Sequence, residues 1–146
     1  MLRVARKTTR KRRPTRPVSK SSPEACPLSR HGGPGTCVWC GRGLVGRQTR
    51  WCSPACSLDW ARNHVWTEAR KAARRRDGYA CVGCGVTEGD HNAERRGWQA
   101  HEVDHVARAF GAHGTASCAH HLGNLRTLCR PCHLEKTRAD RARDGR

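Results

Sequence analysis

The sequence predicts a small α+β protein whose fold is stabilised by bound metal ions. Three observations lead to this prediction: a low apolar content, cysteines in closely spaced pairs, and a C-terminal order of strand, loop, strand and helix. Hydrophobic residues make up 36% of the 146 residues, with one Phe, one Tyr and one Met. Such a chain cannot form a large apolar core, and small domains of this kind usually depend on metals or disulfides.

Ten cysteines are available, and eight of them form four pairs with two or three intervening residues. This spacing favours zinc over disulfides. We interpret the other two, Cys26 and Cys118, as bystanders because neither has a local signature of activation. The predicted structural zinc sites are Cys37, Cys40, Cys52 and Cys56 for the first ion, and Cys81, Cys84, Cys129 and Cys132 for the second.

The net charge of +17, with 29 Lys+Arg against 12 Asp+Glu, predicts a polyanionic partner. Nucleic acid fits best, because no amphipathic segment has the apolar face that binding to an anionic membrane requires. No apolar run is long enough to span a bilayer. The basic N-terminus lacks the apolar segment of a signal peptide, so we expect a cytoplasmic protein whose thiolates stay reduced and bind metal.

The N-terminal half is predicted to contain an arm and a zinc unit. Residues 1–35 hold ten Lys or Arg against one acid, which predicts a disordered basic arm with non-specific phosphate contacts. Residues 36–60 predict a treble-clef-like zinc-binding unit. Gly41 permits the tight turn of its knuckle, and Ser53 caps a helix that has Pro54 at its first position.

A helix is predicted to continue from residue 57 to residue 77, where Asp77-Gly78 ends it. Its part from 61 to 77 is a basic linker that would join the two zinc units rigidly. Residues 78–138 follow as the candidate catalytic domain, and residues 139–146 as a charged tail. Within the domain, the expected elements are a strand over 98–106, an irregular Gly- and His-rich loop over 110–123, a strand over 125–128 and a helix from about Pro131.

Four elements of this region occur in a recognisable order. They are Arg75-Arg76-Asp77-Gly78-Tyr79-Ala80-Cys81-x-x-Cys84-Gly85, Val103-Asp104-His105-Val106, Asn124-Leu125-x-x-Leu128-Cys129-x-x-Cys132-His133 and Lys136-Thr137. Together they resemble the HNH endonuclease family, whose core is the ββα-metal fold. The resemblance covers about residues 75–138 and is specific because many elements fall in order with suitable gaps. The first zinc unit resembles, more loosely, N-terminal fingers found on some members.

The resemblance implies a role for each residue of an open metal site. His105 would be the general base that takes a proton from water for in-line attack on a phosphodiester. Asp104 and His133 would hold a divalent Mg, Mn or Ni ion that stabilises the transition state. Asn124 would tie down the loop and orient His105. Neighbouring residues on a strand point to opposite faces, so Asp104 and His105 are expected to serve different tasks.

Other polar residues of the domain receive weaker interpretations. One of His113, Cys118, His120 and His121, which fill the gap before Asn124, could replace or add a metal ligand. We interpret these histidines and His101 as surface polar residues, and Glu102 as a partner that supports a neighbour. The residues predicted to contact DNA phosphates are Arg74, Arg75, Arg76, Lys136 and Arg138.

The implied function is a metal-dependent DNA endonuclease that nicks or cuts duplex DNA, with two structural zinc ions. Small HNH proteins of this kind occur in phages and mobile elements, with roles in packaging, homing and restriction. The alternative is a non-catalytic zinc-stabilised module that binds nucleic acid. An RNase or a transcription regulator is less favoured, because stacking aromatic platforms are not evident. The oligomeric state stays open, since one ββα unit cuts one strand and double-strand cleavage would need a dimer or two events.

Overall fold

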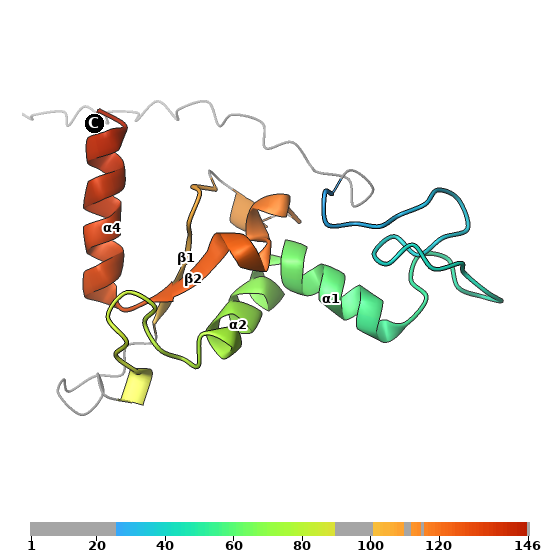
Figure 1. Cartoon of the computed structure of the whole chain (residues 1–146), viewed down its shortest axis with the longest axis horizontal. Coiled ribbons are helices and arrows are strands. Elements are labelled where there is room, and N and C mark those ends of the chain that lie inside the picture. Colours follow the sequence, from blue (N-terminus) through green and yellow to red (C-terminus); the bar gives the residue numbers. More distant parts are fainter. Residues whose placement is uncertain (1–25, 90–100, 110–111, 115, 146) are drawn as a thin grey trace, which may run out of the picture.

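The computed structural model describes residues 26–89, 101–109, 112–114 and 116–145. In this part of the chain, loops, three helices and a two-stranded sheet follow one another along the long axis of the molecule (Figure 1). The predicted small α+β fold is therefore confirmed. The elements are α1 (Pro54–His64), α2 (Trp66–Arg76), β1 (Glu102–His105), the 3₁₀ turns η2 (Ala112–Gly114), η3 (Cys118–His120) and η4 (Leu122–Asn124), β2 (Leu125–Leu128) and α4 (Arg130–Arg143).

The start of α1 and the preceding knuckle form as predicted. The Oγ of Ser53 accepts a hydrogen bond from the backbone N–H of Cys56 at 3.2 Å, and Pro54 occupies the first turn. Gly41 has a φ of +75°, and a Cβ there would lie 2.2 Å from the carbonyl oxygen of Arg30. Only glycine fits at that position.

The predicted continuous helix from 57 to 77 is wrong, because the chain breaks at Val65. This residue has φ −96° and ψ 116°, an extended conformation that suits a β-branched side chain. The break reorients α2 so that Ala69 and Ala73 pack on Leu125 of β2. The segment predicted to be a linker helix therefore contributes Ala69 and Ala73 to a hydrophobic cluster.

The predicted boundary of the basic arm is also wrong. Residues 1–25 lie outside the described residues, but residues 26–35 fold onto the first zinc unit. Cys26 is buried, and the backbone N–H of Arg30 donates to the carbonyl of Trp39 at 2.9 Å. At the other end, α4 extends to Arg143, so most of the predicted C-terminal tail is helical.

The predicted strands are short and antiparallel. β2 has the predicted bounds, and β1 covers the last part of the predicted strand, whose residues 98–100 lie outside the described residues. Glu102 pairs with Leu128 and His105 with Leu125. This register places the Asp104-His105 pair at the end of β1, opposite the start of β2, and Asp104 contacts Lys136 of α4.

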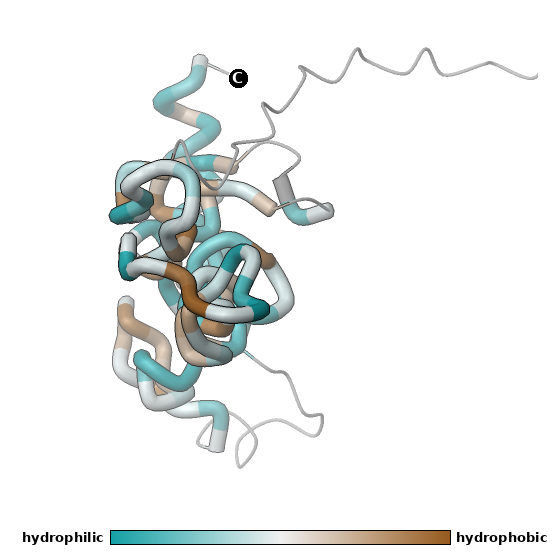
Figure 2. Tube along the Cα trace, turned by 90° about the vertical axis from the view of Figure 1, so that its right-hand side faces the viewer, coloured by the Kyte–Doolittle hydropathy of each residue, from teal (hydrophilic) through white to brown (hydrophobic). Residues whose placement is uncertain are grey.

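The hydrophobic core is divided into two small clusters. One joins Ala69, Ala73 and Leu125; the other joins Leu128 with the sulfurs of Cys81 and Cys129. Figure 2 shows that hydrophobic stretches are short along the whole described trace. Among the described helices, none combines the length and apolar character needed to cross a membrane.

A partly buried polar network ties the end of α2 to η4 and β2. The guanidinium of Arg76 donates to the carbonyls of Leu122 and Leu125 at 2.5 and 2.7 Å. Asp77 pairs with Arg76 and accepts a hydrogen bond from the backbone N–H of Thr127 at 2.9 Å. Burial alone would raise the pKa of Asp77, but the hydrogen bonds from Arg76 and Thr127 outweigh it and lower the pKa below its ordinary value.

We expect Asp77→Asn to lower the free energy of unfolding by about 1–3 kcal/mol, since it weakens a partly buried charge-assisted network. Urea unfolding at neutral pH and fixed zinc concentration measures the change. Asp59→Asn is the matched control, because Asp59 pairs with Arg62 on the exposed surface of α1; its effect should stay below about 0.5 kcal/mol. Equal effects of the two substitutions would contradict the role given to Asp77.

Candidate active site and metal centres

The first predicted zinc group is assembled. One sulfur atom from each of its four cysteines lies within 4.8 Å of the others. The Sγ of Cys52 is 3.5 Å from those of Cys40 and Cys56. The edge of a tetrahedron of sulfurs around zinc is about 3.8 Å, given Zn–S bonds of about 2.3 Å. The spacing therefore fits a single tetrahedral ion, held between a knuckle and the first turn of α1.

The second predicted zinc group is assembled in the same way. It joins the knuckle at Cys81 and Cys84 to the start of α4, and the Sγ atoms of Cys84 and Cys129 are 3.7 Å apart. Backbone hydrogen bonds from Cys129 and Cys84 outweigh burial and lower the pKa of Cys81 to about 6. A thiolate is thus favoured at Cys81, whereas the contact with Cys129 raises the pKa of Cys132.

Asp104 and His133 face each other between the sheet and α4. The Oδ1 of Asp104 lies 3.7 Å from the Nε2 of His133. Glu102 contacts the Nδ1 of His133, as a supporting carboxylate would. With Nδ1–H donated to Glu102, the lone pair of Nε2 is available on the side of Asp104. A carboxylate oxygen and an imidazole nitrogen at this separation suit one divalent cation with open positions.

Lys136 occupies the other side of the Asp104 carboxylate. Its Nζ lies 3.0 Å from Asp104 and 2.9 Å from Asp140, and it donates to the carbonyl of His105 at 2.8 Å. Arg126 approaches the same carboxylate at 3.4 Å. Lys136, predicted to contact DNA, is here a largely buried counter-charge for two acids. A divalent cation on Asp104 would have to share the carboxylate with this ammonium group.

His105 points to the opposite face of β1, as strand geometry requires. Its ring is 6% exposed and stacks on Trp66 with centroids 5.0 Å apart. Its Nε2 lies 3.0 Å from the Nδ1 of His120. Burial, and then the nearby His120 and His113, lower the pKa of His105 to about 4. The imidazole is therefore neutral near pH 7, which is the form that accepts a proton.

Asn124 links the backbone near His105 to the backbone near His120. Its Oδ1 accepts from the N–H of Ala107 at 2.7 Å, and its Nδ2 donates to the carbonyls of Ala107 and Ala119 at 3.1 and 2.9 Å. Ala107 follows β1 by two residues, and Ala119 precedes His120. This is the placement that the predicted positioning role requires.

A hollow of about 310 Å³ opens beside these groups. Asp104 and His105 both line it, so the two residues adjoin the same space. Its lining residues are Asp104, His105, Arg108, Ala109, His113, Lys136, Thr137 and Asp140. Its charged lining residues are two acids, Asp104 and Asp140, and two bases, Arg108 and Lys136, so a phosphate group would enter next to both signs of charge.

The predicted DNA contacts of α2 are only partly available. Arg74 pairs with Glu88 at 2.5 Å, and Arg76 is engaged by Asp77 and two carbonyls. Both guanidinium groups stabilise the fold, because α2 packs on the sheet rather than lying free. Arg75 and Arg138 are exposed and stay open to a polyanion.

Several interpretations of polar residues are corrected by burial. His101 and His120 are 5% and 0% exposed, so neither is a surface residue. Cys26 and Cys118, read as bystanders, lie in a third group with His64 and His121. Cys26 and His64 come from two other segments far away in the sequence, so their membership could not be predicted from spacing. The short Cys118-x-x-His121 spacing is the local signal of the group.

Comparison with protein-family models, curated proteins and solved structures found no match to this chain. The interpretation of the site consequently depends on its residues, their geometry and the resemblance of its motifs.

We expect Cys129→Ala to abolish ordered structure in the C-terminal unit. Zinc binding contributes on the order of 10 kcal/mol to such folds, which is comparable to the whole stability of a small domain. Hydrogen exchange should show lost amide protection in β2 and α4, with protection near Cys37 retained. Cys52→Ala is the reciprocal control and should affect the first unit most. Retained protection in β2 after Cys129→Ala would contradict a structural role for that zinc group.

Proposed function

We propose that the protein is a metal-dependent endonuclease that hydrolyses phosphodiester bonds in duplex DNA, with a core of the HNH type. One observation carries the proposal: Asp104 and His133 face each other while the next residue along β1, His105, is a neutral imidazole at the same hollow. A module that only binds nucleic acid needs no such arrangement. The order of β1, β2 and α4 around a four-cysteine group also supports it.

In this proposal, a divalent cation held by Asp104 and His133 supplies positive charge to the phosphate in the transition state. Glu102 fixes the ring of His133 through Nδ1. The site residues match a hard cation such as Mg, Mn or Ni, because they offer one carboxylate and one imidazole and leave positions for water and phosphate.

His105 is the proposed base for the attacking water. In the tautomer whose Nε2–H donates to His120, the lone pair of His105 lies on Nδ1, and that nitrogen accepts the proton. Asn124 holds the backbone that follows His105 close to the turn that carries His120. Trp66 covers the ring and limits its motion.

The proposed substrate is DNA because the chain carries a net charge of +17. Lys136 would assist substrate binding. A cation on Asp104 would weaken the ion pair between that carboxylate and Lys136, and the ammonium group, kept close by Asp140, could then contact a phosphate oxygen. A role in a phage packaging or mobile-element system is the biological setting that the resemblance suggests.

A non-catalytic module that binds nucleic acid is the second candidate. It is favoured by the contacts of Asp104, whose carboxylate is already paired with Lys136 and approached by Arg126. In that case the acid would serve the fold rather than a metal. Nicking and binding must therefore be measured on the same preparations.

We expect purified protein to relax supercoiled plasmid when Mg, Mn or Ni is added, and His105→Ala to slow nicking by about 10²–10⁴-fold. Substitution of the base should leave zinc content and DNA affinity unchanged. His31→Ala is the matched control, since His31 hydrogen-bonds Thr36 in the first zinc unit, far along the chain from β1; it should nick like the unaltered chain.

Asp104→Asn and His133→Ala should also lose the response to added divalent cation. Equal nicking by His105→Ala and the unaltered chain would exclude His105 as the base. Absence of nicking in every preparation, with salt-sensitive DNA binding retained, would favour the binding module.

A further inference from the structure

We propose that Cys26, His64, Cys118 and His121 bind a third zinc ion, and that this ion fastens the first zinc unit to the turn that carries His120. The inference concerns a site outside both predicted four-cysteine groups, and it stands whether or not the protein is a nuclease. It has three supports: the separations of the donor atoms, the orientation of His64, and the segments that the four residues connect.

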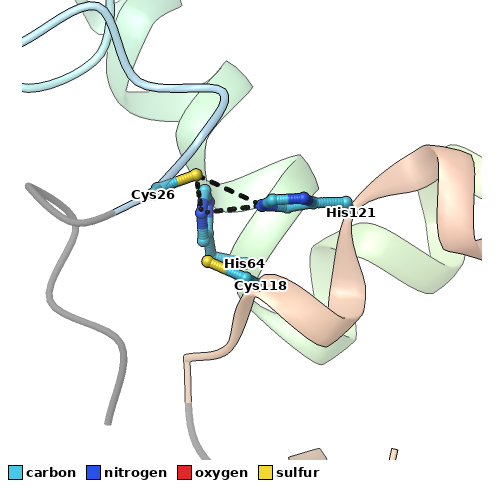
Figure 3. A group of neighbouring side chains, drawn as sticks. All are labelled: Cys26, His64, Cys118 and His121. Carbon is cyan, nitrogen blue, oxygen red and sulfur yellow. Dashed lines mark hydrogen bonds between the residues drawn. The ribbon is translucent and has the colours of Figure 1, made fainter. Parts of the chain in front are cut away.

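The donor atoms converge on one point. Figure 3 shows the sulfur of Cys26 and the ring nitrogens of His64 and His121 in a triangle, with the sulfur of Cys118 beside them. Cys26 Sγ lies 3.2 Å from His64 Nε2 and 3.3 Å from His121 Nε2, and the two nitrogens are 3.3 Å apart. In a tetrahedral zinc site, the corresponding edges are about 3.6 Å for sulfur to nitrogen and about 3.3 Å between nitrogens.

The orientation of His64 makes Nε2 a metal donor. Its Nδ1 lies 2.8 Å from the carbonyl oxygen of Trp60, an acceptor, so Nδ1 carries the proton and Nε2 carries the lone pair. A carbonyl behind the coordinating ring is the usual support of a zinc-bound histidine. Trp60 also stacks on the His64 ring with centroids 4.7 Å apart, which fixes the plane of the imidazole.

Hydrogen bonds alone do not account for the triangle. One thiol offers one hydrogen and His64 Nε2 offers none, so two of the three contacts at most can be satisfied by protons. The neighbouring Cys118 adds a second sulfur within 4.8 Å of all three atoms. A central cation satisfies every donor at once. Four protein ligands leave no open position, which is typical of structural rather than catalytic zinc.

The site connects segments that are far apart in the sequence. Cys26 begins the described part of the first unit, His64 ends α1, and Cys118 and His121 flank His120 on η3. Two hydrogen bonds dock the same turn on α1: the N–H of Ser117 donates to the carbonyl of His64 at 3.0 Å, and the N–H of Leu122 to Asn63 at 3.1 Å. The third zinc would therefore set the position of His120 and, through the 3.0 Å contact, of His105.

Zinc content of the full chain tests the assignment. After removal of loosely bound metal, the unaltered protein should hold three zinc ions per chain, and the Cys118→Ala/His121→Ala double variant should hold two. His31→Ala is the matched control for loss of a histidine and should hold three. Two ions in the unaltered protein, or three in the double variant, would overturn the proposal.

Thiol mapping of the unaltered protein gives a second test that does not depend on the folding of a variant. Cys118 is only partly buried, so burial by itself would leave it reactive toward N-ethylmaleimide. We expect Cys26 and Cys118 to resist alkylation in the zinc-loaded chain and to react once a chelator removes zinc. The third site would be refuted if Cys118 were alkylated in the zinc-loaded protein while the eight paired cysteines stayed protected. Cobalt-substituted protein should in addition show a site with mixed sulfur and nitrogen ligands.

Discussion

The convergence of cysteine sulfurs is the constraint on which the rest of the structure depends. In the part of the chain that the structure describes, buried apolar side chains form two small clusters, and the second consists of Cys81, Cys129 and Leu128. The thiolate groups hold each knuckle against the start of a helix, at α1 in the first unit and at α4 in the second. A tetrahedral metal–thiolate centre is directional and strong, so it can fix backbone geometry where non-directional apolar packing is too sparse.

The site residues gain their positions from these centres. His133 follows Cys132 on α4, so the group that anchors the helix also places the imidazole opposite Asp104. On the other face of β1, α2 brings Trp66 against His105, and the Arg76–Asp77 network holds α2 to β2. On one side of this short strand Asp104 faces His133 of α4, and on the other side His105 faces Trp66 of α2.

The sequence predicted local features well and long-range features poorly. The cap at Ser53, the end of α2 at Asp77 and the bounds of β2 depend on neighbouring residues, whose preferences are visible in a short window. The cysteines of both four-cysteine groups are likewise recognisable from the close spacing within each pair. The break at Val65 was missed because its cause is tertiary: α2 must turn to bury Ala69 and Ala73 on the sheet. The buried states of His101 and His120, and the grouping of Cys26 with His64, involve partners many residues away, which spacing cannot reveal.

The four-cysteine groups change how the charge of the protein is distributed. The formal charge of +17 treats every cysteine as neutral, yet zinc bound by four thiolates carries a formal charge of about −2. With zinc bound, two anionic centres would lie at the starts of α1 and α4, whereas the side chains of Arg75 and Arg138 are exposed. A polyanion approaching the zinc-loaded molecule would therefore be attracted by the exposed arginines and repelled by the metal–sulfur centres. This arrangement would keep nucleic acid phosphates away from the ions that hold the fold together.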